Sequence, residues 1–340
     1  MLAIAFVVSL TSCSTLGYYS QSVIGHSRLM LARQSIDKVL LEADADLKSK
    51  LLLAQDLKQF AVNRLALPDN QSYSSYVALE REFPVWTVVA AEEFSIQARS
   101  WCYPVIGCAS YRGYFSKHAA LEYAESLAKD NFETTVGGAV AYSTLGWFSD
   151  PLVPSMMRYG VADFAETMFH ELAHQQLYIK NNSDFNEAFA TMVGEQGTII
   201  WLSENRPELL ADYRQQLAAR AEFSALIAST KQSLADVYSA EKSAGVMRKQ
   251  KLEVFDRLNP EYQKLKQQSW QGKGWFDNWF KKPLNNARLA AFSTYRDQVP
   301  NFTSLLQQCG SNFTRFYNSL ATAKTDQEHA TVPPSCVADI

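Results

Sequence analysis

The segment that most constrains this chain is residues 170–174, His-Glu-Leu-Ala-His, an H-E-x-x-H pattern inside an apolar run that predicts a helix over about residues 161–178. Residues four apart lie on one face of a helix, so His170 and His174 can bind the same metal ion. Two imidazoles at this spacing suit zinc, which needs one further protein ligand and keeps a position open for water and substrate. Glu171 lies on the same turn, where it can take a proton from water that the metal activates. The pattern predicts a catalytic zinc site, and the alternative is a buried helix with two hydrogen-bonded core histidines.

A third ligand is expected on the next predicted helix, over about residues 185–201. Glu187 follows His174 by thirteen residues and lies at the start of that helix. A carboxylate from an adjacent helix would complete a His2Glu ligand set, which occurs in catalytic zinc sites. Glu195, two helical turns beyond Glu187, is the competing ligand. We therefore expect one zinc ion per chain, bound by His170, His174 and Glu187.

Composition limits the classes of protein to which the chain can belong. It has 340 residues, of which 47% are apolar, enough for a large core in one extended domain or two. The net charge is −3 and the charges are dispersed. Nucleic-acid binding is therefore not expected, because it requires a concentrated basic surface.

The N-terminus carries an apolar run over residues 1–10 that is too short to span a bilayer. With residues 10–13, Leu-Thr-Ser-Cys, it resembles a bacterial lipoprotein signal peptide in which Cys13 is lipidated. The basic segment that usually precedes such a run is missing, which suggests a start further upstream or a trimmed chain. Ser14, rather than Asp, follows the cysteine, and in a Gram-negative cell this implies the outer membrane. We expect a lipid-anchored protein of the cell envelope that faces the periplasm; the alternative is a short buried N-terminal strand or helix.

The cysteine count agrees with export to an oxidising compartment. Of five cysteines, lipidation of Cys13 leaves four. Cys102 and Cys108 flank a short loop and can form a local disulfide, and Cys309 and Cys336 can tie down the C-terminal tail. The alternative is four inert free thiols.

The remaining pattern predicts an α+β chain that is mostly helical. Strands are expected near residues 84–90, 110–115 and 134–142, and helices over 18–67 (with a break at 44–50), 117–130, 203–256, 284–309 (with a break at Pro300) and 312–323. A small sheet from residues 84–142 is expected to pack on the metal helix, wrapped by N- and C-terminal helices. The expected regions are a signal-peptide remnant (1–13), an N-terminal helical region (18–83), a catalytic core (84–201) and a C-terminal helical region (202–340).

Two further features bear on partners. Gly137 and Gly138 lie inside the strand predicted over residues 134–142, and a glycine pair in a strand marks close approach of another backbone or a bulge. We expect an edge strand that can pair with an extended peptide across the zinc, while tight packing against the metal helix explains the pair equally well. The helices predicted over residues 18–67 carry charges of both signs, which favours packing on protein over contact with a membrane.

Several motifs carry a resemblance that covers residues 18–309. They lie at residues 101–104, 107–108, 111–115, 141–147, 150–151, 169–175, 185–187 and 284–289. With these motifs the sequence resembles the bacterial predicted zinc-dependent aminopeptidase family, whose members are often lipoproteins. The resemblance implies a zincin-like catalytic core and a metallopeptidase activity.

The site also resembles that of the gluzincins, with one departure in the ligand region. Asn186 and Glu187 begin a gluzincin-like N-E-x-x-A pattern, which favours Glu187 over Glu195 as the third ligand. Gluzincins often carry an Asp four residues after the ligand Glu, where it orients a zinc histidine. This chain has Thr191 there. Either Thr191 has that role, or another acid does, with three candidates: Asp163, Glu166 and Glu195.

A second departure concerns recognition of the substrate amine. Some gluzincin aminopeptidases bind the free amine with the Glu of a G-A-M-E-N strand segment. Residues 138–142 of this chain, Gly-Ala-Val-Ala-Tyr, lack that Glu. A buried ammonium needs a carboxylate or carbonyl partner. The acids that could provide it are Glu133, Asp150, Glu166 and Glu195.

These observations predict a zinc metallopeptidase that hydrolyses peptides in the bacterial cell envelope, with an aminopeptidase as the first expectation. Glu171 would act as general base and pass the proton to the leaving amine. Tyr142 is the first candidate for a donor to the oxyanion, because it ends the predicted substrate strand. The other candidate donors are Tyr178, Tyr114, Arg112 and His118. The alternatives are a zinc-dependent endopeptidase, another amide hydrolase, or a scaffold lipoprotein with a non-catalytic metal. Asn285 and Asn286 are expected to cap a helix, and the alternative is that they reach the cleft.

Overall fold

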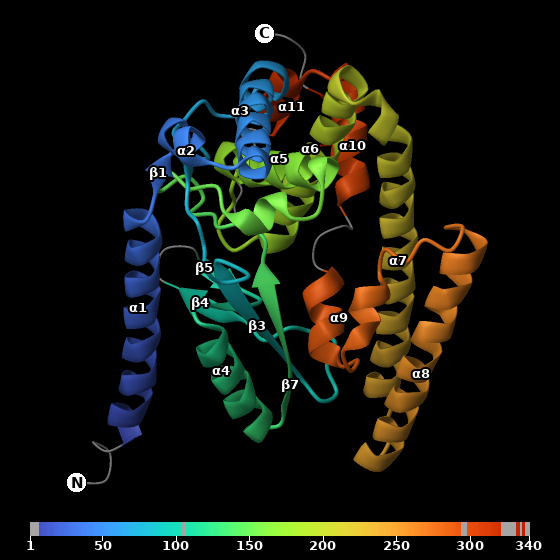
Figure 1. The fold of residues 1–340 in the computed structure, drawn as a ribbon. Helices are drawn as coiled ribbons and strands as arrows, with labels where there is room; N and C mark the ends of the chain where they lie inside the picture. Colours follow the sequence, from blue (N-terminus) through green and yellow to red (C-terminus); the bar gives the residue numbers. More distant parts are fainter. Residues whose placement is uncertain (1–6, 104–106, 294–297, 321–330, 334, 337–340) are drawn as a thin grey trace.

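Helices dominate the described residues, and three small antiparallel sheets lie among them: a three-stranded one and two of two strands each, β1–β2 and β4–β5 (Figure 1). The computed structural model describes residues 7–103, 107–293, 298–320, 331–333 and 335–336. The predicted signal segment with Cys13 lies outside the residues whose side chains are described. The fold is α+β and mostly helical, as predicted. Among the described helices, none has the length and apolarity needed to cross a bilayer.

The three-stranded sheet has the strand order β6–β3–β7 and is antiparallel throughout. Its strands are β3 (Val85–Glu92), β6 (Arg112–Tyr114) and β7 (Phe132–Ala139). Helix α4 (Lys117–Lys129) covers the sheet, and its buried residues recur at helical spacing: Ala120, Ala124 and Leu127. The three strands and α4 lie close to the predicted ranges.

Gly138 of β7 is a tight packing point, but its partner is not the predicted one. A Cβ at Gly138 would lie 2.0 Å from Cδ2 of Phe83, so this position is packed against Phe83 and not against the metal helix. Strand β7 is an edge strand, as predicted. However, the carbonyl of Thr134 accepts a hydrogen bond from Asn285 Nδ2 (2.9 Å), and that of Val136 accepts one from Lys282 Nζ (3.2 Å). This part of the edge is covered, so any peptide could pair only with the end that follows Gly137.

The metal helix belongs to a different hydrophobic cluster from the sheet. The cluster of the metal helix combines elements from both ends of the chain: α3 (Ala45–Leu65), α5 (Val161–Gln176), α6 (Ser183–Asn205), α10 (Val299–Gln308) and α11 (Phe313–Ser319). Helix α5, the predicted metal helix, packs mainly on α6, α3 and the short helix η1 (Pro154–Met157), whereas the sheet packs mainly on α4 and α9 (Asn286–Ser293). The predicted packing of the sheet on the metal helix is therefore wrong. A stretch of chain that begins at the end of β7 links the two clusters.

The remaining elements complete the fold. They are α1 (Val7–Leu31), β1 (Gln34–Ser35), α2 (Ile36–Glu42), β2 (Ser75–Tyr76), β4 (Trp101–Tyr103), β5 (Gly107–Ala109), η1 (Pro154–Met157), α7 (Pro207–Ser239), α8 (Ala244–Gln268), η2 (Asp277–Lys281) and α9 (Asn286–Ser293). The predicted helical region 18–67 is divided at residues 32–35 as well as before α3, and Pro300 lies in the first turn of α10. Both predicted cysteine pairs, Cys102–Cys108 and Cys309–Cys336, are disulfide-bonded.

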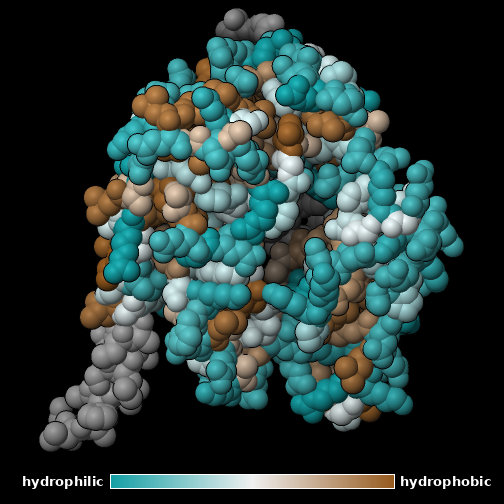
Figure 2. All heavy atoms as spheres, viewed as in Figure 1, coloured by the Kyte–Doolittle hydropathy of each residue, from teal (hydrophilic) through white to brown (hydrophobic). Residues whose placement is uncertain are grey.

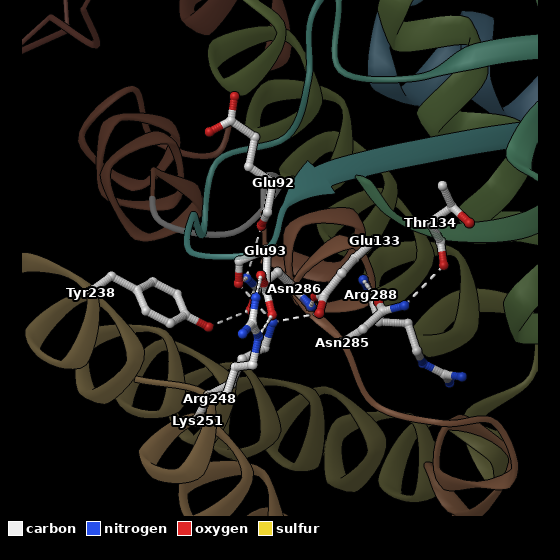
Figure 3. A network of polar contacts seen from close by, with 10 residues as sticks. All are labelled: Glu92, Glu93, Glu133, Thr134, Tyr238, Arg248, Lys251, Asn285, Asn286 and Arg288. Atoms are coloured by element: carbon white, nitrogen blue, oxygen red, sulfur yellow. Dashed lines mark hydrogen bonds and ion pairs between the residues drawn. The ribbon is translucent and has the colours of Figure 1, made fainter. Parts of the chain in front are cut away.

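A polar network attaches the α7–α8 hairpin to one end of the sheet (Figure 3). The buried Lys251 of α8 pairs with Glu133 of β7 and donates to the carbonyl of Glu93 (2.7 Å). Asn286 of α9 donates to the carbonyls of Glu92 (3.1 Å) and Glu93 (2.9 Å). Asn285 accepts a hydrogen bond from the backbone of the third residue after it and so caps α9, as predicted.

Candidate metal centre

The turn between α5 and α6 is closed by the side chain of Asn186. Its Oδ1 accepts from the backbone N–H of Ile179 (2.8 Å), and its Nδ2 donates to the carbonyl of the same residue (2.7 Å). Asn186 is buried, so these two bonds replace all hydrogen bonding to water. The bonds fix the first turn of α6 against the end of α5, and Glu187, the next residue, faces the histidines.

Gly194 allows the two helices to approach closely beside His170. A Cβ at this position would lie 3.0 Å from the carbonyl oxygen of Glu166 and 3.3 Å from Cβ of His170. Any larger residue would push α6 away from α5 at the level of the histidines. The sequence therefore brings the helices together at two points, the turn and Gly194.

Three predicted ligands lie together in this structure. The Nε2 atoms of His170 and His174 are 3.1 Å apart, and Oε2 of Glu187 lies 3.4 Å from the first and 3.6 Å from the second. A tetrahedral zinc ion with bonds of about 2.0–2.1 Å separates its ligand atoms by about 3.3 Å. The donor set and its spacing therefore fit one zinc ion. No other group of three metal-ligating side chains of this kind occurs in the described part of the chain.

The charges of the three groups are strongly coupled. Burial lowers the pKa of His170, but the hydrogen bond and charge of Glu187, with the charges of Glu171 and Glu166, outweigh it and raise that pKa to about 9. Burial raises the pKa of Glu187, but hydrogen bonds from both histidines hold it well below its usual range. A cation at this position would take the place of the proton that the site otherwise holds.

The three acids predicted as candidates to orient a zinc histidine, among them Glu195, the competing ligand, lie in a separate ion cluster around Arg220 of α7. Glu166 accepts hydrogen bonds from Arg220 Nη1 (2.5 Å) and from the hydroxyl of Tyr213 (2.8 Å), and Asp163 lies 3.4 Å from Arg220 Nη2. Glu195 is buried, and its charge acts on Arg220 and Tyr213. None of these acids reaches Nδ1 of His174, which is buried and has no hydrogen-bond partner among the described residues.

Glu171 faces a second set of residues, from the chain segments before β3 and after β7. Asp150 is fully buried and accepts hydrogen bonds from the backbone N–H (2.9 Å) and the hydroxyl (2.8 Å) of Thr144. Burial raises the pKa of Asp150 to about 6, Thr144 opposes this, and the charge of Glu171 adds to it. Tyr73 is also buried, has a left-handed φ of 60°, and its hydroxyl has no partner among the described residues. Burial, then the charges of Glu171 and Asp150, raise the pKa of Tyr73.

A family model described as "Putative aminopeptidase" matches residues 17–331. The chain belongs to this family. No curated protein and no solved structure shows a significant match. The family description indicates a peptidase acting on peptide substrates.

The residues predicted to assist catalysis in this aminopeptidase-family protein lie in different places. The hydroxyl of Tyr142 forms a 2.7 Å hydrogen bond with Nδ1 of His26 on α1. Tyr178 lies near Glu187, and burial followed by that charge raises its pKa. Three other candidates lie elsewhere: Tyr114 and Arg112 pack with Tyr123 beside α4, and His118 is exposed and pairs with Glu122.

Sequence reasoning missed Tyr73 and Tyr111 of this family member. Tyr111 as a whole residue is 40% exposed, but desolvation, then the charges of Glu187, Tyr178 and Glu171, raise its pKa, so it lies within range of the charges of the predicted third ligand and the predicted base. Tyr111 lies just after the β4–β5 hairpin, which is fixed to the α5–α6 turn by a hydrogen bond from Cys108 N to Asn181 Oδ1 (3.1 Å). Its place in the motif at residues 111–115 was an available signal. Tyr73 has no such signal in the sequence.

Proposed function

We propose that the protein is a zinc-dependent peptidase in which His170, His174 and Glu187 bind the metal. The observation that carries this proposal is the convergence of three ligand atoms at 3.1–3.6 Å from one another beside Glu171, in a member of an aminopeptidase family. The ligand spacing matches the size of zinc, and two imidazoles with one carboxylate are a common zinc donor set.

Glu171 is the proposed general base. When bound, zinc supplies Lewis acidity that polarises the scissile carbonyl and lowers the pKa of water at the site. Glu171 accepts a proton from that water and delivers it to the nitrogen of the leaving amine. Asp150 and Tyr73 lie within range of the charge of Glu171.

Tyr111 is the proposed donor to the negative charge that develops on the substrate oxygen. It lies near both Glu187 and Glu171, and hydroxyl donors at such positions stabilise tetrahedral intermediates. Tyr178 is the second choice because it lies near Glu187. Tyr142 was the first choice from the sequence, but its hydroxyl is hydrogen-bonded to His26, and it is now the third choice.

Aminopeptidase activity is the first proposal, and one observation favours an endopeptidase as the second. Of the four acids predicted to bind a substrate amine, Glu133 pairs with Lys251, and Glu166 and Glu195 lie in the Arg220 cluster. Asp150 is fully buried and bound by Thr144. Each of these acids is already engaged within the protein, and an endopeptidase needs no amine site.

The proposed location is the bacterial cell envelope, with a lipid on Cys13 and the protein facing the periplasm, most simply at the outer membrane. Two disulfides support it, because such bonds persist in oxidising compartments. The apolar run before Cys13 supports it as well.

Metal content and hydrolysis test the proposal together. Purified wild type should hold one zinc ion per chain by plasma mass spectrometry, Glu187→Ala should lose it, and the matched control Glu195→Ala should keep it. Glu171→Gln should keep the zinc and lose at least a hundredfold in kcat. Zinc retained in Glu187→Ala and lost in Glu195→Ala would reverse the ligand assignment; no zinc in the wild type after reconstitution would overturn the proposal.

Paired substrates distinguish the two peptidase classes. The same peptides are offered with a free and with an acetylated N-terminus, and products are identified by mass. Release of single N-terminal residues from free peptides alone indicates an aminopeptidase. Internal cuts in both sets indicate the endopeptidase.

A further inference from the structure

We propose that the outward face of α1 rests on the surface of an anionic phospholipid membrane. This face contains an apolar stripe that we define by its exposed residues: Leu16, Tyr19, Val23, Ile24 and Leu31. Leu31 is 85% exposed, Leu16 68% and Val23 65%. Figure 2 shows hydrophobic atoms along the outer edge of this helix, at the left of the view.

Helical geometry places the apolar stripe opposite the face that packs on protein. At about 100° per residue its five members lie within an arc of about 140°. The opposite face contacts the body of the protein: Leu29 is buried, His26 hydrogen bonds with Tyr142, and Gln21 accepts from the backbone of Phe115 (3.2 Å). Helix α1 is therefore attached to the protein by specific contacts, and loose packing does not explain its exposed apolar side chains.

The outward arc contains no charged residue. Its other members are Ser20, Ser27 and Met30. An exposed helix face of a soluble protein ordinarily carries charges, and a contiguous apolar surface marks an interaction site. The outward face of α1 is therefore expected to contact an apolar partner.

Charge and chain continuity select a membrane as that covering. Residues 1–36 contain no Asp or Glu, whereas Arg28 is exposed at the border of the stripe. Basic residues beside an apolar helix face bind anionic headgroups. The charges of both signs that argued against membrane contact start at Asp37 and belong to α2 and α3. The apolar run of residues 1–10 extends into the start of this helix, so any membrane attachment there brings α1 to the bilayer.

A second copy of the chain is a poorer match for this face. From Leu16 to Leu31 the helix is about 22 Å long, and with a width of about 10 Å it offers roughly 220 Å². A stable protein interface buries about 800 Å² on each partner. The stripe is too small for a stable dimer by itself, whereas a membrane adds headgroup contacts.

Vesicle flotation tests the inference on the full chain with Cys13→Ser, so that no acyl chain contributes. The protein should float with phosphatidylethanolamine–phosphatidylglycerol vesicles and bind more weakly to phosphatidylcholine vesicles. Val23→Glu/Ile24→Glu should lower the partition coefficient at least tenfold, and Leu16→Glu/Leu31→Glu should do the same. The matched control Leu252→Glu, an exposed leucine on α8, should bind like the parent.

Several outcomes would overturn the inference. They are a parent protein that stays unbound, a double variant that floats equally well, an equal loss in Leu252→Glu, and a parent dimer in light scattering that the variants convert to monomer. Circular dichroism and zinc content check that the variants are folded. Because membrane binding is measured without any assay of hydrolysis, this inference and the proposed peptidase function can fail separately.

Discussion

At the scale of single residues, Asp150 has a pH dependence with a definite sign. Burial raises its pKa from 3.8 to about 6, although Thr144 donates two hydrogen bonds to it. Because the folded-state pKa is the higher one, the folded state holds the proton more tightly than the unfolded state. The stability due to this group is complete below pH 3.8 and is lost as the pH rises through 6.

The variant Asp150→Asn isolates this effect, because it cannot ionise. We expect the free energy of unfolding of the wild type, relative to the variant, to fall by about 2.4 kcal/mol between pH 4 and pH 7. Urea unfolding of both proteins across this range measures the difference. Two parallel pH curves would show that Asp150 does not titrate as described.

At the scale of elements, the α5–α6 turn determines how well the ligands are placed. Asn186→Ala removes both hydrogen bonds to Ile179, and Glu187 follows directly in the chain. Loss of a group that orients a metal ligand typically weakens metal binding by about 10- to 100-fold. We expect a zinc affinity reduced by that factor, measured by competition with a chromophoric chelator.

Asn182→Ala is the matched control for this prediction. Asn182 lies in the same turn and caps α6 by accepting from Phe185 N (3.2 Å). Its loss should cost about 1 kcal/mol of stability and leave the zinc affinity within about threefold of the wild type. Equal losses of affinity in both variants would assign the effect to the turn as a whole and not to Asn186.

Comparison of sequence and structure also belongs to this scale. The spacing of His170 and His174 was predictable because it depends on one helix, and Glu187 because only a short turn separates the helices. The covering of the sheet by α9 was not, because α9 meets β3 and β7 through contacts distant in sequence. The proximity of both Tyr73 and Asp150 to Glu171 could not be predicted from the sequence either, because no local sequence pattern links these positions.

At the scale of the whole molecule, the described residues form three hydrophobic clusters rather than one continuous core. The cluster of α7 and α8 meets the sheet through the network of Figure 3, in which Lys251 is a buried cation. A buried charge is tolerated only with partners, and Lys251 has Glu133 and the Glu93 carbonyl. The attachment of the α7–α8 hairpin to the sheet therefore depends on the Lys251–Glu133 ion pair. Removal of one partner alone leaves the other without its counter-charge.

Lys251→Met tests this dependence, because methionine keeps most of the volume and removes the charge. It leaves Glu133 half-buried, with the backbone N–H of Asn286 (2.7 Å) as its other donor. We expect a loss of about 3 kcal/mol in the free energy of unfolding by urea, with faster hydrogen exchange in α8. Lys251→Met/Glu133→Gln should recover part of that loss, because no unpaired charge remains. The exposed Lys249→Met should stay within about 0.5 kcal/mol of the wild type. A double variant as unstable as the single one would mean that Lys251 acts through its packing and not through its charge.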